Sequence, residues 1–312
     1  MRLIHHLEDA QLTEESVVTI GSFDGVHRGH QSLIAEMRDA AFKANRAAVV
    51  MTFFPHPSVV LGRAQPFYLT SPEEKLVQIN HTGVDLLIEW PFTLETARLR
   101  ATEFIDQLVT QLRMRELWVG HDFALGYQRE GNAEFLTQLG ETRGFIVKTV
   151  DPITNDGEVI SSSGIRAALH AGDVAHAAHL LGRWFRLSGR VVPGDGRGRT
   201  IGIPTANLAV WPEHAVPANG VYACRAWVGH IAHAAAINIG TRPTVTDQTQ
   251  RTIEAHVLDF DKDLYGINLA LDFVERLRGE QKFSGVEALV AQIRSDIEQT
   301  RHIVTRDVLQ VA

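Results

Sequence analysis

Two histidines, His27 and His30, stand three positions apart in residues 21–30, where they could bind and polarise a phosphate group. The segment follows a short β-branched run and precedes apolar residues at helical spacing, so it joins a strand to a helix. Open α/β sheets bind ligands at such strand ends, and the free N–H groups of a helix start favour phosphate. Gly25 and Gly29 allow close backbone approach, while both imidazoles can donate hydrogen bonds to charge developing on a phosphoryl group. The alternative is a glycine-rich turn with two incidental histidines, which the strand–glycine–helix order argues against.

A second glycine-rich segment, residues 194–207, offers a different phosphate site. Its loop carries Arg197 and Arg199 and can wrap phosphates with backbone N–H groups. Thr205 and Asn207 are two residues apart, so on an extended chain their side chains point to the same side. A hydroxyl and an amide oxygen are hard ligands that suit Mg²⁺. The alternative is a flexible hairpin loop followed by an edge strand.

Three further features could carry chemistry, although each also has a structural interpretation. The serines of residues 161–166 can cap a helix, and Arg166 can bind phosphate oxygens with its planar fork; alone, they indicate an N-cap with a surface arginine. His56 stands between two prolines, which hold it rigidly either for a phosphate or nucleotide or for packing in the turn. Glu254 lies in an alternating strand on the face opposite Ile253, where a solvated glutamate is the ordinary expectation.

In order and spacing, these segments resemble the motifs of bacterial bifunctional riboflavin kinase/FAD synthetases. The sequence His-Arg-Gly-His is similar to the HxGH motif of nucleotidyltransferases. The first half continues the family order with residues 52–57, 119–123 and 161–166. Residues 194–207 contain a match to the Gly-Arg-x-x-Gly-x-Pro-Thr-Ala-Asn signature of flavokinases. The second half continues the family pattern with residues 219–223, 238–244 and 277–283.

The resemblance implies a set of site residues in each half. In the first half, His27 and His30 would be catalytic, and the ATP-binding residues would be Gly21, Phe23, Asp24, Gly25, Gly29, Ser162, Ser163 and Arg166. In the second half, the ATP-binding residues would be Gly196, Arg197, Gly198, Arg199, Gly202 and Pro204. The flavin would contact Pro55, His56, Asp122 and Arg278. Thr205 and Asn207 would hold Mg²⁺, and Glu254 would take the proton from the 5′-hydroxyl of riboflavin.

The implied protein is an enzyme with two activities, whose substrates are riboflavin, FMN and ATP. The second half would phosphorylate riboflavin to FMN, and the first half would adenylylate FMN to FAD with release of pyrophosphate. Two alternatives stay open: an FAD synthetase with a degenerate kinase half, and a non-catalytic flavin or nucleotide sensor. The intact Pro-Thr-Ala-Asn stretch and the retained acid/base and phosphate groups argue against them. Candidates for stacking on the isoalloxazine ring are Phe54, Phe123 and Phe283.

One departure from the family pattern is visible after the Asp-Phe pair of residues 122–123. The family often carries Arg-Phe-Gly there, whereas this chain has Ala124 and Leu125 before the glycine. A phosphate contact from that arginine therefore does not carry over to this chain. Arg129 is close enough in sequence to substitute for it.

The elements that must position these residues change character along the chain. In the first half, β-rich runs such as residues 47–54 alternate with helical patterns such as residues 31–42. This alternation is typical of a doubly wound parallel sheet in an α/β fold. Ser71 and Glu74 fit a capping box at the start of one helix, with a proline at its first position.

The second half predicts a different fold. After about residue 182, turn residues separate short strands without intervening helices, which predicts a small antiparallel β-barrel. An apolar stripe from Val286 to Ile297 predicts a C-terminal helix that packs on the barrel. We therefore expect an FMN adenylyltransferase domain at residues 1–184 and a riboflavin kinase domain at residues 185–312.

Composition limits the class of partner. The 312 residues carry 30 Lys and Arg against 37 Asp and Glu, a net charge of −7, which argues against a nucleic-acid partner. The longest apolar run is too short to span a bilayer, and residues 1–10 do not resemble a secretory signal. The single cysteine, Cys224, cannot form an intrachain disulfide, which fits a cytoplasmic location. Binding one nucleotide needs only a local field, so the net charge does not exclude it.

Overall fold

The computed structural model describes residues 1–155, 157–194, 196, 198, 201–243 and 249–308. Arg197 and Arg199, two of the expected ATP contacts, lie outside the described residues. The chain divides into two compact units, Met1–Ser162 and Ser163–Ala312, and each unit is described by itself.

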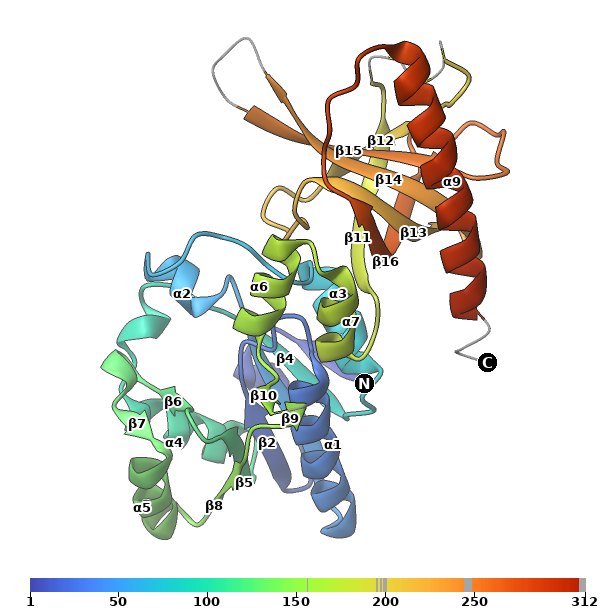
Figure 1. Cartoon of the computed structure of the whole chain (residues 1–312). Helices are drawn as coiled ribbons and strands as arrows, with labels where there is room; N and C mark the ends of the chain where they lie inside the picture. The colour runs from blue at the N-terminus through green and yellow to red at the C-terminus, as the bar shows by residue number, and fades with distance from the viewer. Residues whose placement is uncertain (156, 195, 197, 199–200, 244–248, 309–312) are drawn as a thin grey trace. The chain divides into compact units, whose positions relative to one another are not determined.

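A six-stranded parallel sheet forms the centre of the N-terminal unit, with the strand order β1-β4-β3-β2-β5-β8 (Figure 1). The strands are β1 (Arg2–Ile4), β2 (Ser16–Ile20), β3 (Ala47–Phe54), β4 (Leu86–Pro91), β5 (Met114–Gly120) and β8 (Ile146–Val150). The chain proceeds from β2 through β3 to β4 on one side, then returns to pair β5 with β2 on the other. The switch point therefore lies between the carboxyl ends of β2 and β5, where open α/β sheets bind ligands.

Helices cover both faces of this sheet, which confirms the predicted doubly wound fold. They are α1 (Arg28–Lys43), α3 (Pro72–Asn80), α4 (Ala101–Gln111) and α5 (Ala133–Arg143). Met37 of α1 packs in one buried apolar cluster with Val50 of β3. Phe104 of α4 belongs to a second cluster, which contains Val49 of the same strand. Because successive strand residues face opposite sides, the two clusters are the cores of the two faces.

Local capping and turns set where these elements begin. Ser71 and Glu74 form the predicted capping box of α3: the hydroxyl of Ser71 accepts the N–H of Glu74 at 3.2 Å, and the Glu74 carboxylate accepts the N–H of Ser71 at 3.0 Å. The structure adds short elements that no sequence pattern predicted. They are α2 (Pro57–Val60), the antiparallel pair β6 (Ala124–Leu125) and β7 (Gly131–Asn132), and the pair β9 (Thr154–Asn155) and β10 (Glu158–Val159).

A closed antiparallel barrel forms most of the second unit, with the strand order β11-β12-β15-β14-β13-β16, which confirms the predicted fold class. Its strands are β11 (Phe185–Val192), β12 (Ala206–Val210), β13 (Gly220–Val228), β14 (Ile231–Pro243), β15 (Thr249–Val257) and β16 (Asn268–Arg278). Phe185, Tyr222 and Phe273 fill its interior as a group of buried rings. Two helices, α6 (Ser162–Ala171) and α7 (Val174–Leu181), precede the barrel, and α7 packs on β11 and β16.

The last helix, α9 (Val286–Val308), packs on β13, β14 and β16, as predicted for a C-terminal helix. Its predicted apolar stripe is wrong at the start, where Val286 is 62% exposed. The buried side chains of its central turns are polar instead. Asp296 is buried because it accepts hydrogen bonds from Arg278 of β16, so an ion pair joins the helix to the barrel there.

Candidate active sites

The glycine-rich loop after β2 is wound tightly at the switch point of the parallel sheet. Phe23, Gly25 and Val26 all have positive φ, at 47°, 79° and 38°. The ring of Phe23 covers Gly21, where a Cβ would lie 3.0 Å from Cζ of that ring. Thr52, near the end of β3, donates a hydrogen bond from its hydroxyl to the carbonyl of Ser22 at 3.0 Å. Glycine is needed at position 21 because the loop folds back on itself there.

His27 and His30 lie together at the start of α1, as their spacing predicts. His27 is the N-cap, and its Nδ1 accepts the N–H of His30 at 3.4 Å. The two rings stack with centroids 3.6 Å apart, and the edge of the Phe23 ring meets His30 at 5.1 Å. A Cβ at Gly29 would lie 3.2 Å from the His27 ring, so this glycine leaves room for the stack.

The protonation of this pair follows from its burial. Burial lowers the pKa of His30 well below its usual value, and the neighbouring His27 lowers it further. His30 is therefore a neutral imidazole at neutral pH. Its Nδ1 is buried and has no hydrogen-bond partner among the described residues. Because Nδ1 of His27 accepts a hydrogen bond, the proton of a neutral His27 sits on Nε2.

Asp24 joins the loop to other parts of the same unit. Its side chain is 3% exposed, and its Oδ1 accepts the N–H of Leu69 at 3.0 Å. The next residue, Gly25, donates its N–H to the hydroxyl of Thr70 at 3.4 Å. Ser162 donates its hydroxyl to the main-chain carbonyl of Asp24 at 2.9 Å. The structure thus brings together two of the expected ATP residues, Asp24 and Ser162. The expected Ser163 and Arg166 belong to the second unit.

A pocket of about 340 Å³ lies in the N-terminal unit, and several aromatic rings contribute to its lining. They are Phe53, Trp90, Phe92, Phe104, Phe123 and Tyr127. Of the three phenylalanines expected to stack on a flavin, Phe123 lines this pocket, whereas Phe54 packs beside Tyr68 with centroids 5.8 Å apart. Apolar walls of this kind suit a flat aromatic ligand. Sequence reasoning missed the other rings: Phe53, Trp90 and Phe92 lie at or just after strand ends, whereas Phe104 lies in α4 and Tyr127 in a short turn.

The polar residues expected beside the flavin lie on the loops around this pocket. His56 lines it and caps α2, with Nδ1 accepting the N–H of Ser58 at 3.1 Å. Pro55, which directly precedes His56, is exposed. Arg129 also lines the pocket and donates to the main-chain carbonyl of Asp122 at 2.8 Å. The guanidinium suggested by sequence as a substitute is thus placed at the aromatic pocket.

A second site lies in the barrel, where Thr205, Asn207 and Glu254 line one pocket of about 270 Å³. Glu254 of β15 stands opposite Asn207 of β12 and opposite Asn238 of β14 in the strand register. Side chains of opposed residues share a face of the sheet, so the barrel itself gathers these groups. Other residues of this pocket, missed by sequence reasoning, are Asn238, Thr241, Thr252 and Glu280; the expected Gly196 and Gly198 also line it.

The glycine-rich loop packs closely against Thr205 and Asn207. A Cβ at Gly198 would lie 2.3 Å from the carbonyl of Ile203 and 3.2 Å from the Thr205 hydroxyl, and one at Gly194 would lie 2.0 Å from Nδ2 and 3.0 Å from Oδ1 of Asn207. A hydroxyl and an amide oxygen in a cradle that any side chain would fill are a donor set that fits a hydrated Mg²⁺. No group of three or more His, Cys, Asp or Glu side chains able to hold a metal occurs among the described residues.

A further pocket of about 460 Å³ adjoins this one, because Thr205 lines both. Pro204 also lines the larger pocket, and Nδ1 of His256 lies 2.8 Å from its main-chain carbonyl. Phe260 and Tyr265 supply rings to its wall. The expected Gly202 has a φ of 75°, which favours glycine at that turn.

Arg278, an expected flavin contact, has a carboxylate partner in the structure. Its guanidinium donates to Asp296 at 2.8 Å and lies over the ring of Phe283 at 5.6 Å from the centroid. Neither Arg278 nor Phe283 lines any of the pockets described above.

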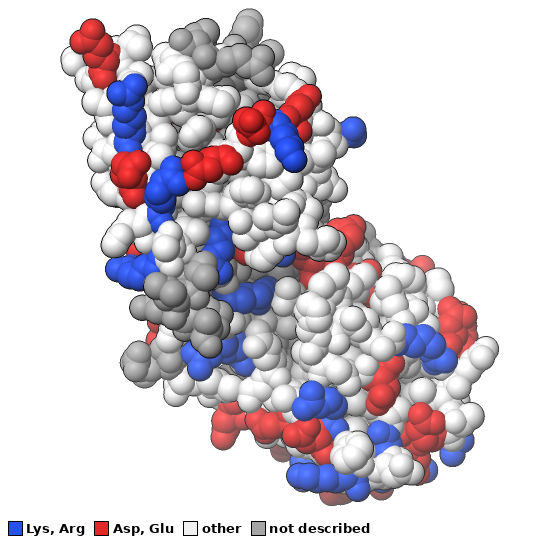
Figure 2. Space-filling model, turned by 90° about the vertical axis from the view of Figure 1, so that its right-hand side faces the viewer, with Lys and Arg blue, Asp and Glu red and all other residues white. Residues whose placement is uncertain are grey.

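Charges on the surface are mixed. On the face drawn in Figure 2, acidic and basic side chains are interspersed with neutral surface. No helix among the described residues is long and apolar enough to span a membrane.

Comparison with known proteins matches both halves. Residues 9–164 match the family model described as FAD synthetase, and residues 181–304 match the one described as riboflavin kinase. The chain is 40% identical over 299 residues to a bifunctional riboflavin kinase/FMN adenylyltransferase of Escherichia coli K12, covering 95% of each chain. It is 37% identical to a protein of the same description from Bacillus subtilis 168, covering 96% of this chain and 97% of that one. A crystal structure described as a macrolide-efflux protein from Streptococcus pneumoniae is 33% identical, with a TM-score of 0.88 over 96% of this chain and 98% of its own.

Proposed function

Because this chain belongs to the family of bifunctional riboflavin kinase/FMN adenylyltransferases, we propose that its two groups of pockets are the two active sites of that family. The enzyme phosphorylates riboflavin with ATP to FMN, and it adenylylates FMN with ATP to FAD and pyrophosphate. The observation that carries the proposal is the meeting of Thr205, Asn207 and Glu254 in one pocket. Asn207 and Glu254 come from two strands about fifty positions apart, and Thr205 directly precedes the first of them. Together they supply a general base and oxygen ligands. Such a set counts against a degenerate kinase half and against a passive sensor.

In the kinase site, Glu254 takes the proton from the 5′-hydroxyl of riboflavin as that oxygen attacks the γ-phosphate of ATP. The bond between the γ-phosphorus and the β–γ bridging oxygen breaks, and ADP leaves. A carboxylate within reach of the hydroxyl is a suitable base for phosphoryl transfer. Thr205 and Asn207 hold Mg²⁺, which when bound neutralises charge on the nucleotide phosphates. The phosphates lie against Gly196 and Gly198, and the nucleoside occupies the adjoining pocket that Pro204 and Thr205 line.

In the adenylyltransferase site, the phosphate of FMN attacks the α-phosphate of ATP and pyrophosphate leaves. That nucleophile is already an anion, so the step requires no base. The start of α1 and the Nε2–H of His27 face the reacting phosphates as donors, and His30 supports the same charge. Loop residues Gly21 to Gly29 let the nucleotide approach the backbone, and Ser162 holds the loop through Asp24.

The flavin of FMN occupies the aromatic pocket of the N-terminal unit. Its flat ring suits the walls built by Trp90 and Phe123, because aromatic pairs gain energy beyond the area that they bury. Pro55, His56 and Asp122 border the pocket on the loops that follow β3 and β5. Arg129, held by the carbonyl of Asp122, supplies the positive charge that Ala124 and Leu125 lack. In the kinase half, the family resemblance alone assigns Arg278 to the riboflavin site; its guanidinium is paired with Asp296.

The two activities divide at residues 184 and 185. β11 begins at Phe185 and is the first strand of the barrel, which supports a kinase domain at residues 185–312. The adenylyltransferase domain then comprises residues 1–184. A cytoplasmic location is supported by Cys224, which is buried and free.

Two variants of the full-length protein test the assignment. The protein is incubated with ATP and Mg²⁺, and riboflavin, FMN and FAD are separated by chromatography. Glu254→Ala should abolish FMN formation from riboflavin yet still convert added FMN to FAD, and His30→Ala should do the reverse. Glu287→Ala and His81→Ala, both at exposed positions, are the matched controls. If either site variant lowers both activities equally while the protein stays folded, the assignment of two sites is wrong.

A further inference from the structure

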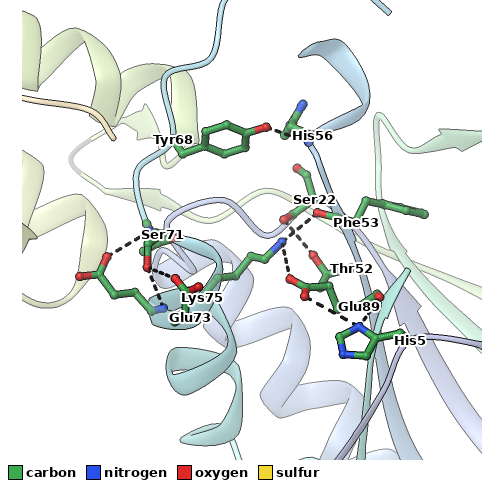
Figure 3. Close-up of polar contacts among 12 residues, drawn as sticks. His5, Ser22, Thr52, Phe53, His56, Tyr68, Ser71, Glu73, Lys75 and Glu89 are labelled. Atoms are coloured by element: carbon green, nitrogen blue, oxygen red, sulfur yellow. Dashed lines mark hydrogen bonds and ion pairs between the residues drawn. The ribbon is translucent and has the colours of Figure 1, made fainter. Parts of the chain in front are cut away.

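A buried lysine lies beneath the aromatic pocket of the N-terminal unit. Lys75 of α3 is 6% exposed, and its Nζ donates to the main-chain carbonyl of Phe53 at 2.8 Å. The carboxylate of Glu89 on β4 lies 3.9 Å from the same Nζ, and His5 lies beyond it (Figure 3). A charged lysine is almost never fully buried without a partner, so its place here calls for an explanation.

Lys75 bonds to a strand end whose residues contact both the aromatic pocket and the glycine-rich loop. Phe53 lines the aromatic pocket, and its ring meets that of Phe92 edge-on with centroids 5.7 Å apart. The preceding residue, Thr52, donates to the carbonyl of Ser22 in the glycine-rich loop at 3.0 Å. Lys75 therefore fixes the backbone at the end of β3, where the flavin side and the nucleotide side adjoin.

The segment that leads into α3 makes parallel connections. Tyr68 accepts the main-chain N–H of His56 on its hydroxyl at 3.0 Å, at the rim of the pocket. Leu69 donates to Asp24, and Thr70 accepts from Gly25, so the same short segment also holds the glycine-rich loop. Residues 68–75 thus connect with both sides of the site through main-chain atoms or buried side chains. We call this segment the brace.

We propose that Lys75 is a positioning residue for FMN adenylylation, which sets the geometry of the flavin pocket through Phe53 without contacting either substrate. This inference rests on the proposed function of the N-terminal unit. Burial lowers the pKa of Lys75, and the carboxylates of Glu89 and Asp24 oppose that shift. The protein thus keeps a costly cation beside the pocket, although an apolar side chain of similar length would fill the same space.

The test separates positioning from simple support of the fold. In Lys75→Met the Phe53 carbonyl loses its donor and Glu89 loses its cation, so the N-terminal unit should melt at a lower temperature. The kcat/KM for FMN should fall at least tenfold, while riboflavin kinase activity of the same chain stays unchanged. In the double variant Lys75→Met/Glu89→Gln no buried charge is left unpaired, so the melting temperature should recover. The kcat/KM for FMN should stay low, because Phe53 still lacks its donor.

Two further variants, one at an exposed lysine and one at Tyr68, accompany these measurements. Lys43→Met, at an exposed position on α1, should match the wild-type chain in both activities. If Lys75→Met does not fold, Tyr68→Phe removes one hydroxyl from the brace and should raise the KM for FMN about threefold or more. The proposal is overturned if the double variant recovers FMN adenylylation together with its stability. It is also overturned if Tyr68→Phe and Lys75→Met leave the kinetics with FMN unchanged. Absence of FAD from the wild-type chain with FMN and ATP would instead overturn the proposed function.

Discussion

Adding one methyl group at Gly194 should stop the kinase reaction by moving a single side chain. The Cβ of an alanine there would lie 2.0 Å from Nδ2 and 2.6 Å from Cγ of Asn207, whereas ordinary contact begins at 3.4 Å. The φ angle of Gly194 does not lie in the positive range that favours glycine, so alanine can adopt the same backbone conformation. The clash is therefore with the end of a side chain, which can swing away without unfolding the barrel.

The size of the effect follows from these distances. To reach ordinary contact with the new Cβ, the amide of Asn207 must move by about 1.4 Å, because its Nδ2 starts 2.0 Å from that position and ordinary contact begins at 3.4 Å. It must move within the cradle that it shares with Thr205 and Glu254. A displacement of about 1 Å in a site can lower the rate by about a hundredfold, or about 2.7 kcal/mol in activation free energy. We therefore expect kcat/KM for riboflavin to fall about a hundredfold. The free energy of unfolding should change by less than about 1 kcal/mol, because alanine also restricts the unfolded chain.

The assay measures FMN formation over a range of Mg²⁺ concentrations and FAD formation from added FMN in the same preparation. Gly194→Ala should raise the Mg²⁺ concentration needed for half-maximal kinase rate, while FAD formation stays at the wild-type level. Gly285→Ala is the matched control, because a Cβ there has no heavy atom within 4 Å. Normal kinase activity in Gly194→Ala would refute the role given to Asn207. Loss of both activities would show that the loop supports the whole fold instead.

Two further predictions concern the N-terminal unit. Gly29→Ala places a Cβ 3.2 Å from the His27 ring and disturbs the stack of that ring with His30. FAD formation should therefore fall at least tenfold, while FMN formation is unchanged. FAD formation at the wild-type rate would show that the stack is dispensable. The pKa of His30 is lower in the folded protein than in the unfolded chain, so below about pH 6.5 the unfolded chain binds one more proton at this residue. The free energy of unfolding should therefore fall as the pH drops below about 6.5, by up to about 1.4 kcal/mol per pH unit. Denaturant unfolding of the ligand-free protein between pH 5 and 7 should show this slope, His30→Gln should lose it, and an identical slope in both would contradict the assigned pKa.

The fold was predictable from the sequence because its signals are periodic. The run Ala47–Phe54 of β3 is buried on both faces for most of its length, and its apolar, β-branched composition records that burial. The capping box of Ser71 and Glu74 is equally local. The edge strand β1 was missed because three residues carry no period. Val286 was misjudged because apolar character along a helix does not show where contact with the barrel begins.

The candidate sites were predictable only where their residues are neighbours in sequence. His27 and His30 share one turn, and Thr205 directly precedes the strand β12 that carries Asn207, so spacing alone brings each pair together. The aromatic pocket has no such signal, because its rings come from strand ends, a helix and loops far apart in the chain. Lys75 was also hidden: a lysine among polar helix residues indicates an exposed position, and only the tertiary structure shows it buried over Phe53.

A chain with a net charge of −7 can bind polyanionic substrates if the charge of its binding site depends on whether the nucleotide is bound. In the ligand-free protein, burial keeps His30 neutral, so the N-terminal site acts first through donors and a helix start rather than through net positive charge. An approaching polyphosphate favours the charged form of a nearby imidazole. Binding of ATP should therefore raise the pKa of His30 and draw a proton into the site as negative charge accumulates there. The positive charge is then present when the nucleotide is bound, and the acidic chain need not keep it in a buried site when the nucleotide is absent.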